Sequence, residues 1–405
     1  MRIARPRLLP AALAAGTAIA LAGCGRSHQL SGPSARIAPV APQGAVAVTT
    51  RNTSRLGGAD AVADAAAVAR TVYPGLTQAT SPAAVVVVDR ANWSGALAAS
   101  ELAGAPLAAP LLYAEGGKLG ALSAQTLAAM HPRGAGALAG AQVIRVATSA
   151  PVPGGLQTRT LAAGEPAVQA AAIEAILQRA QGGRAPRAVI VLAANAARSL
   201  QMPAAGLAAE SGAPILFVNF QRVPVATASV LTTLHRPSIY VIGAAAIGAR
   251  TLRTLRRFGA VTRITTGAAS AEGAVSDAIA VARFTDGVFG WGVREPGHGL
   301  VFENAARALD APAAALLSAT GDYGPVLLQA RPAPVSSVLA SYLANIQPAY
   351  TAAPQFRPVR GVYNHGWLIG DERAISALTQ AEVDALLEIS PRRASSEEPS
   401  LSPPE

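Results

Sequence analysis

The chain has 405 residues, of which 51% are hydrophobic and 14% are charged, so it is long and apolar enough for two or three compact domains and is not intrinsically disordered. Its formal net charge is +10, and only 4% of its residues are aromatic. Because no basic block is interleaved with aromatic residues, this composition argues against nucleic acid as a partner and favours anionic polymers, acidic glycans or lipid headgroups.

The N-terminal segment predicts an exported lipoprotein. Basic residues open the chain, an apolar run follows over residues 8–21, and Leu21-Ala-Gly-Cys24 resembles a bacterial lipobox. We therefore expect residues 1–23 to be a lipoprotein signal peptide and Cys24 to carry a diacylglyceryl membrane anchor, the alternative being a chance cysteine. Cys24 is the sole cysteine, which excludes an intramolecular disulfide and a cysteine-based zinc site. The Ser-, Pro-, Gly- and Ala-rich residues 24–45 predict a flexible tether.

A spacing of 104 residues repeats along the rest of the chain. Arg55, Arg159 and Arg263 lie at this interval (159 − 55 = 104; 263 − 159 = 104), and a glycine follows each within five residues. Pro110 and Pro214 each lie 55 residues after the arginine of their copy (110 − 55 = 55; 214 − 159 = 55). The repetition predicts three copies of one unit. We place module 1 at residues 46–155, module 2 at 156–262 and module 3 at 263–389, followed by a disordered tail at 390–405.

Modules 1 and 2 show helix and strand patterns in the same order. In module 1 the patterns predict helices at residues 61–70, 96–102 and 119–130 and strands at 85–88, 109–113 and 142–146. In module 2 they predict helices at 167–179 and 225–234 and strands at 188–192, 213–217 and 238–243. Strands that are apolar on both faces and alternate with helices are typical of parallel sheets. The expected fold is therefore α/β, with three tandem Rossmann-like modules and mostly parallel sheets.

Module 3 keeps this order but is longer. Its patterns predict helices at residues 271–284 and 335–343 and strands at 287–291, 324–328 and 366–370. The interval from the first strand to the proline of the second strand is longer than in modules 1 and 2. This difference predicts an insertion at residues 292–304. A second insertion is expected at residues 346–360. Long insertions into regular α/β units commonly form binding loops.

A polar and aromatic cluster is predicted in module 3. It comprises Trp291, His298, Asn364, His365 and Trp367, near the ends of predicted strands. Because ligands of open α/β sheets bind at the carboxyl ends of parallel strands, we expect a pocket for a sugar or a phosphate. The alternative is that the histidines occupy turns and the tryptophans lie in the core. No motif for catalysis, a metal or a cofactor is found, so an enzyme is not predicted.

Short segments of the chain resemble the type 2 cell wall-binding repeat. The resemblance covers about residues 46–389 and is carried by Asn92-Trp-Ser-Gly-Ala-Leu97, Ala109-Pro-Leu-Leu112, Ala213-Pro-Ile-Leu216 and Ile239-Tyr-Val-Ile-Gly243. It implies three Rossmann-like modules in a pseudo-threefold, trimer-like assembly. It also implies non-covalent attachment to anionic polymers of a Gram-positive cell wall, through the Pro-Ile-Leu-Leu region and basic residues at module junctions.

The leading hypothesis is a membrane-tethered lipoprotein, exported and facing the cell wall, whose three repeats bind an anionic wall polymer. The candidate polymer-binding residues are Arg55, Arg159, Arg263, Asn92, Trp93, Ser94 and Arg294. Two alternatives remain open: a lipoprotein that captures a small solute, and a wall-glycan enzyme that uses the module 3 cluster.

Overall fold

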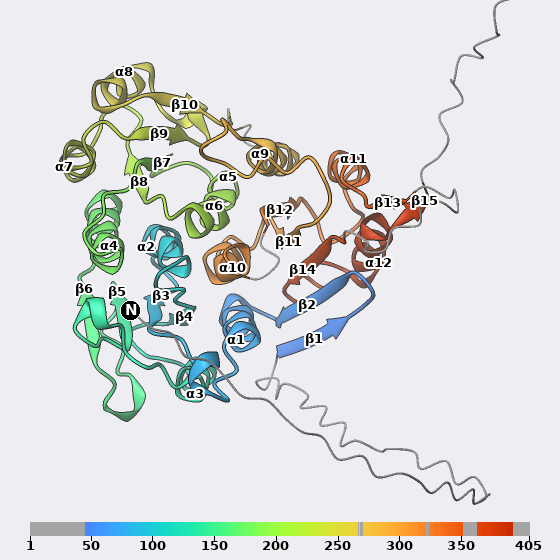
Figure 1. Ribbon diagram of the computed structural model, residues 1–405, viewed down its shortest axis with the longest axis horizontal. Coiled ribbons are helices and arrows are strands. Elements are labelled where there is room, and N and C mark those ends of the chain that lie inside the picture. The colour runs from blue at the N-terminus through green and yellow to red at the C-terminus, as the bar shows by residue number, and fades with distance from the viewer. Residues whose placement is uncertain (1–44, 266, 268–269, 321–323, 351–362, 392–405) are drawn as a thin grey trace, which may run out of the picture. The chain divides into compact units, whose positions relative to one another are not determined.

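Three sheets of mostly parallel strands, connected by helices, form the framework of the described chain (Figure 1). The computed structural model describes residues 45–265, 267, 270–320, 324–350 and 363–391, all within one compact unit. The predicted α/β fold with mostly parallel sheets is confirmed. The pseudo-threefold arrangement stays a prediction.

The first two sheets have the same strand order. The first sheet runs β4 (Leu111–Ala114), β3 (Val85–Asp89), β5 (Val143–Val146) and β6 (Thr158–Leu161). The second runs β8 (Ile215–Val218), β7 (Ala188–Ala193), β9 (Ser238–Val241) and β10 (Val261–Arg263). Every pair in both sheets is parallel. The valine-rich central strands β3 and β7 are buried almost throughout, as their continuous apolar sequences predict.

The third sheet joins the two ends of the described chain. Its order is β1 (Ala45–Thr49), β2 (Thr53–Gly58), β14 (His365–Ile369), β11 (Gly299–Asn304) and β12 (Val326–Gln329). Strand β2 lies parallel to β14, and β1 lies antiparallel to β2 at the edge. The N-terminal strands, predicted to belong to module 1, therefore complete the sheet of module 3.

The strands that carry Arg55, Arg159 and Arg263 are β2, β6 and β10. None of them belongs to the sheet of the module that its arginine was predicted to open. Strand β6, placed in module 2, pairs with β5 of the first sheet, and β10, which spans the predicted boundary of modules 2 and 3 and includes Arg263, pairs with β9 of the second. The helices that follow β2, β6 and β10 are α1 (Ala61–Val72), α4 (Pro166–Ala180) and α9 (Ala271–Arg283), and they contact β4, β8 and β12 of the next sheet. The sheets thus do not follow the predicted module boundaries, because the repeat period does not reveal where one sheet ends.

Alanine-rich helices pack closely between the sheets. They are α2 (Trp93–Ala99) with η2 (Ser100–Ala103), α5 (Arg198–Gln201) with α6 (Pro203–Ser211), and α10 (Asp310–Ser318). Helices α6 and α10 contact each other and η2. A Cβ on Gly206 of α6 would lie 2.5 Å from Oγ of Ser318 in α10, so this helix contact requires glycine. The small side chains of the composition therefore allow close helix packing.

Two polar contacts link one sheet to another. The hydroxyl of Tyr113 in β4 donates to the carbonyl oxygen of Leu309 at 2.6 Å. The backbone N–H of Ile215 in β8 donates to Oε2 of the buried Glu101 at 3.0 Å. Each contact joins elements of neighbouring sheets.

The remaining helices are α3 (Ala121–Met130), α7 (Val225–Thr233), α8 (Ala249–Phe258), α11 (Ser337–Asn345) and α12 (Ala377–Leu387). Strands β13 (Ala349–Tyr350) and β15 (Ser390–Pro391) form a small parallel pair, so the first two residues of the predicted tail are part of a sheet. Among the described residues, no helix combines the length and the apolar character needed to cross a bilayer. The signal peptide, Cys24, the tether up to residue 44, the tail from 392 and most of the predicted insertion at 346–360 lie outside the described residues.

The predicted strand at residues 287–291 is wrong. Gly287, Gly290 and Gly292 have φ values of 87°, 101° and 63°, which are left-handed conformations that a strand does not contain. Phe289 stacks on Tyr240, with ring centroids 4.0 Å apart. The apolar residues of this segment therefore cover part of the second sheet as a bent loop.

The first strand of module 3 is β11, and it restores the regular spacing. The backbone N–H groups of Val86, Ile190 and Val301 donate to the carbonyl oxygens of Pro110, Pro214 and Pro325 at 2.8, 2.9 and 3.0 Å. Donor and acceptor are 24 residues apart in all three sheets (110 − 86 = 24; 214 − 190 = 24; 325 − 301 = 24). The expected insertion at 292–304 between strand and proline is therefore wrong, and the extra residues precede the strand.

Candidate functional site

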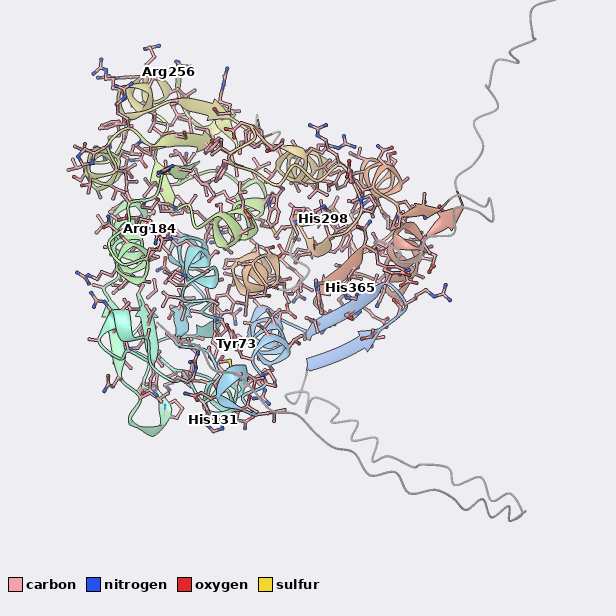
Figure 2. All side chains as sticks on the ribbon, in the orientation of Figure 1. Tyr73, His131, Arg184, Arg256, His298 and His365 are labelled. Atoms are coloured by element: carbon pink, nitrogen blue, oxygen red, sulfur yellow. The ribbon has the colours of Figure 1, made fainter. Side chains whose placement is uncertain are left out.

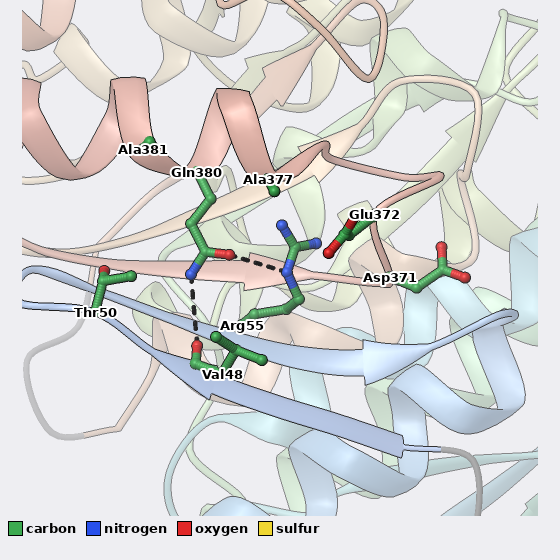
Figure 3. A pocket seen from close by; sticks show the side chains of 8 residues that line it. All are labelled: Val48, Thr50, Arg55, Asp371, Glu372, Ala377, Gln380 and Ala381. Atoms are coloured by element: carbon green, nitrogen blue, oxygen red, sulfur yellow. Dashed lines mark hydrogen bonds between the residues drawn. The ribbon is translucent and has the colours of Figure 1, made fainter.

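Arg55 is a buried structural residue. Its side chain lines a pocket of about 300 Å³ between β2 and α12 (Figure 3). Nε donates to Oε1 of Gln380 at 3.0 Å, and Nη1 donates to the carbonyl oxygen of Gly370 at 3.0 Å. Burial lowers the pKa of Arg55, while Glu372 and Asp371 raise it. The guanidinium joins β2 to the end of β14 and to α12.

The three arginines of the repeat are not equivalent. Arg55 and Arg263 occupy the same register position in their sheets. In the first sheet this position is occupied by Thr160, whose hydroxyl oxygen accepts a hydrogen bond from Nε of Arg145 at 3.0 Å. Arg159 lies one residue earlier, on the opposite face of the strand. Arg55 is buried, Arg159 is half-buried and Arg263 is exposed. The equal spacing in sequence therefore does not produce three equal binding sites.

Asn92 and Ser94 form a helix cap. Oδ1 of Asn92 accepts a bond from the backbone N–H of Gly95 at 3.1 Å, and it accepts the hydroxyl of Ser94 at 3.4 Å. Nδ2 of Asn92 donates to Oε1 of Gln169 in α4 at 2.9 Å. The polar groups of this segment thus begin helix α2 and tie it to α4.

Trp93 lies in the core, with 7% of its surface exposed. Its indole N–H donates to Oε1 of Gln201 at 3.4 Å, and the guanidinium of Arg198 lies 5.8 Å from the ring centroid. The segment that carries part of the family resemblance therefore contributes to helix packing.

The structure brings four residues of the module 3 cluster together. The N–H of His365 donates to the carbonyl oxygen of His298 at 2.9 Å, and both residues are labelled in Figure 2. The rings of His365 and Trp367 meet edge to face with centroids 4.6 Å apart. The buried amide of Asn364 accepts the N–H of Gly297 at 2.8 Å and of His298 at 3.3 Å. These residues lie at the amino ends of β11 and β14, so the expected position at carboxyl ends is wrong. For His298, the cause is that the predicted strand at 287–291, which it was expected to follow, does not form.

The other two candidates in module 3 lie on the loop before β11. Trp291 is half-buried and packs against the core. Arg294 is exposed, and its Nη2 donates to the carbonyl oxygen of Arg283 at 3.4 Å. This loop is held to α9, because the N–H of Val293 donates to the carbonyl oxygen of Ala282 at 2.9 Å.

A stretch of the second sheet carries positive charge without acidic residues. Residues 211–271 contain seven arginines and neither aspartate nor glutamate. All seven are exposed, and within the described part of the chain every ion pair involves residues outside this stretch. The seven are Arg222, Arg236, Arg250, Arg253, Arg256, Arg257 and Arg263. Of these, only Arg263 is among the candidates predicted from the sequence, although the sequence itself shows the absence of acidic residues.

A groove of about 1200 Å³ lies at the amino ends of β7, β8 and β9. The exposed Arg184 and Arg187 line it, together with the stacked rings of Tyr240 and Phe289, and we call it the arginine groove. Glu210 is the single acidic residue among the described residues that line it. Two exposed arginines in one groove can bind phosphate or carboxylate groups.

The tyrosine of the arginine groove is fixed in place. Its hydroxyl donates to Oδ2 of Asp286 at 2.5 Å. Burial, followed by this bond, raises the pKa of Tyr240 to about 12, so the phenol stays neutral at physiological pH. The same bond holds the pKa of Asp286 below its usual range. The stacked rings are therefore fixed in place, with only 3% of Tyr240 and 7% of Phe289 exposed.

A buried acidic cluster lies between the third sheet and α1. Arg307 pairs with Asp64, and its Nε donates to Oδ2 of Asp310 at 2.8 Å. Oδ1 of Asp64 accepts the N–H of Gly58 at 2.7 Å. Burial raises the pKa of Asp310 well above its usual value, and the neighbouring Asp64 raises it further. Among the described residues, no group of three or more His, Cys, Asp or Glu side chains is arranged to hold a metal ion.

Glu303 adds a third carboxyl group to this cluster. Its side chain is 0% exposed, and neither carboxyl oxygen has a hydrogen-bond partner within the described residues. Burial raises its pKa well above the usual value, and so do Asp310 and Asp64. Val88 and Leu192 occupy the same strand position in the other two sheets. The fold therefore does not require a carboxyl group here.

Comparisons with known proteins identify the fold but no family. No protein-family model matches the chain, and no curated protein matches it. Among solved structures, Cwp6 from Clostridium difficile matches with a TM-score of 0.62 and 15% identity, over 85% of this chain and 51% of that chain. Cwp8 from the same organism matches with a TM-score of 0.62 and 13% identity, over 84% of this chain and 52% of that chain. This chain thus spans about half the length of the structures that it matches, and at these identities the similarity shows a shared fold.

Proposed function

We propose that the chain is a cell-wall-associated protein that binds an anionic wall polymer non-covalently through the arginines of its second sheet. The observation that carries this proposal is the run of 61 residues, 211–271, with seven exposed arginines and no acidic residue (271 − 210 = 61). Unbalanced charge of this kind attracts polyanions and costs stability through self-repulsion. The fold shared with two cell wall proteins supports the same location.

The arginine groove supplies a binding site of suitable chemistry. The polymer would lie in this groove, where Tyr240 and Phe289 are largely buried and only shape the wall. Its phosphate or carboxylate groups would accept paired hydrogen bonds from Arg184 and Arg187. Because these arginines are exposed, salt should weaken the interaction. In this proposal the chain binds and performs no reaction.

The lipid anchor is a separate part of the proposal. Its support is the lipobox-like Leu21-Ala-Gly-Cys24 after a short apolar run. With Cys24→Ala, we expect the protein to leave the membrane fraction of the source bacterium. Retention of the Cys24→Ala protein in that fraction would reject the anchor without affecting polymer binding.

Cosedimentation with purified cell walls tests the polymer-binding proposal. Walls before and after removal of their acid-extractable anionic polymers would be compared at low and high salt. Binding should require the polymers, fall with salt, and weaken in the variant Arg184→Gln/Arg187→Gln. The control variant Arg331→Gln/Arg373→Gln also removes two positive charges, from exposed arginines near the third sheet. It should bind like the wild type.

Two results would overturn this proposal. Equal binding of the wild-type protein to intact and stripped walls would show that the anionic polymers are not the ligand. Equal weakening by the control variant would show that total charge matters and that the arginine groove has no special role.

A further inference from the structure

Helix α8 presents a line of arginines to solvent. At 3.6 residues per turn, Arg250, Arg253 and Arg257 fall within a sector about 60° wide, about 4.5 and 6 Å apart along the axis. All three are exposed, whereas Leu252 and Leu255 are buried on the other side of the helix. We call these three residues the α8 stripe.

Helix stability does not explain the α8 stripe. Like charges three or four residues apart destabilise a helix, and Arg253 has such a neighbour on each side. Arg250 lies in the first turn, where the helix dipole disfavours a cation, although Arg257 in the last turn is favourable. Within the described residues, no acidic side chain forms an ion pair with any of the three. The repulsion is therefore unbalanced in the molecule by itself.

The α8 stripe continues towards the arginine groove. At the end of α8, Gly259 lies against the backbone of Arg236 and Pro237, where an added Cβ would be 2.0 Å from the carbonyl oxygen of Pro237. The next residue, Ser238, lines the arginine groove and donates its N–H to the carbonyl oxygen of Arg187 at 2.9 Å. The backbone of Arg236, whose side chain is exposed, thus lies beside the end of α8 and two residues before Ser238 of the groove.

We propose that the α8 stripe is a second contact site for the same polyanion, so that one extended polymer chain lies along α8 and enters the arginine groove. This inference rests on the proposed function. A line of cations with regular axial spacing fits a linear polyanion with repeated charges. A lipid surface fits less well, because an interfacial helix inserts apolar residues, and Leu252 and Leu255 are buried while α8 packs on β10 and α7.

Affinity measurements with a defined polyanion test this inference. The probe is inorganic polyphosphate in long and short chains, with phosphatidylglycerol-containing vesicles as the lipid arm. The stripe variant is Arg250→Gln/Arg253→Gln/Arg257→Gln. Its matched control, Arg90→Gln/Arg331→Gln/Arg373→Gln, removes three exposed arginine charges elsewhere. Unchanged far-UV circular dichroism and thermal unfolding verify that both variants fold.

We expect the stripe variant to bind long polyphosphate about tenfold more weakly than the wild type and the control at low salt, with a shallower salt dependence. Short polyphosphate, which cannot span both sites, should bind the stripe variant and the wild type with similar affinity. An unchanged affinity of the stripe variant for long polyphosphate would overturn the inference, and so would a loss confined to the vesicles.

The failure of this inference is distinguishable from the failure of the proposed function. If the wild type binds walls through their anionic polymers and the stripe variant binds them equally well, only the α8 stripe is rejected. If the wild type binds neither polyphosphate nor polymer-bearing walls, both proposals are rejected.

Discussion

The substitution Glu303→Leu is expected to stabilise the protein. Glu303 is fully buried with no hydrogen-bond partner for either oxygen among the described residues, and leucine stands at the same position of the second sheet, as Leu192. Burying an unbonded polar group costs about 1–3 kcal/mol. Replacing Glu303 with an apolar residue of similar size removes this cost, so we expect the free energy of unfolding to rise by about 1–3 kcal/mol at pH 8.

The pH dependence of this effect has a defined sign. Because the pKa of Glu303 is raised in the folded chain, the folded state binds more protons than the unfolded state above the unfolded pKa of about 4.3. The contribution of Glu303 to stability is therefore complete below that pH and is lost as pH rises through the folded pKa. Glu303→Leu should therefore reduce the decrease in the free energy of unfolding as pH rises. The decrease that is due to Asp310 and Asp64 should remain, because burial also raises their pKa values.

Urea unfolding at pH 4.5, 6 and 8 measures both effects. The control is Glu115→Leu, since the side chain of Glu115 is 69% exposed and its pair with Arg90 is at the surface, so a change within about 0.5 kcal/mol is expected. A Glu303→Leu protein that is less stable than the wild type at pH 8, or that keeps the wild-type pH dependence, would refute the reasoning.

Three further substitutions test the packing. Arg55→Leu should lower the free energy of unfolding by about 3 kcal/mol, because it leaves the carbonyl oxygen of Gly370 and Oε1 of Gln380 without these hydrogen bonds. Arg263→Leu at the same register should change the free energy of unfolding by less than about 0.5 kcal/mol, and equal effects in denaturant titrations would contradict this difference. Asn92→Ala should cost about 1–2 kcal/mol through the lost cap of α2 and the lost bond to Gln169, and Asn92→Asp should retain the cap. Gly206→Val should lower the free energy of unfolding by about 1–3 kcal/mol or more, because its Cβ would lie 2.5 Å from Oγ of Ser318. Calorimetric unfolding like that of the wild type would contradict this and would show that α6 and α10 can move apart.

Much of the fold was predictable because the central strands are continuous apolar runs. Strands β3 and β7 and the helices between them are close to their expected positions. The closure of the third sheet by β2 was not predictable, because Thr53–Gly58 has no apolar run and pairs with a strand more than 300 residues later. Strand β11 was missed because an apolar glycine-containing segment stands before it and resembles a strand.

The candidate sites were less predictable because burial depends on the neighbouring elements. Arg55 and Arg263 share a register, but β2 lies between β1 and β14 and under α12, while β10 is an edge strand. Spacing in sequence cannot reveal this difference. The buried Glu303 could have been noticed as an acidic residue within an apolar run, and the acid-free stretch from 211 to 271 could have been counted directly.

The most direct test of polymer binding is the affinity of the purified protein for the isolated anionic polymer of its own cell wall, at two salt concentrations. The wild type is compared with a variant in which Arg184, Arg187, Arg250, Arg253 and Arg257 are all glutamine. We predict that the wild type binds, that salt weakens its binding, and that the variant loses most of its affinity at low salt. Salt-independent binding, or a variant that binds as tightly as the wild type, would contradict a role for these arginines.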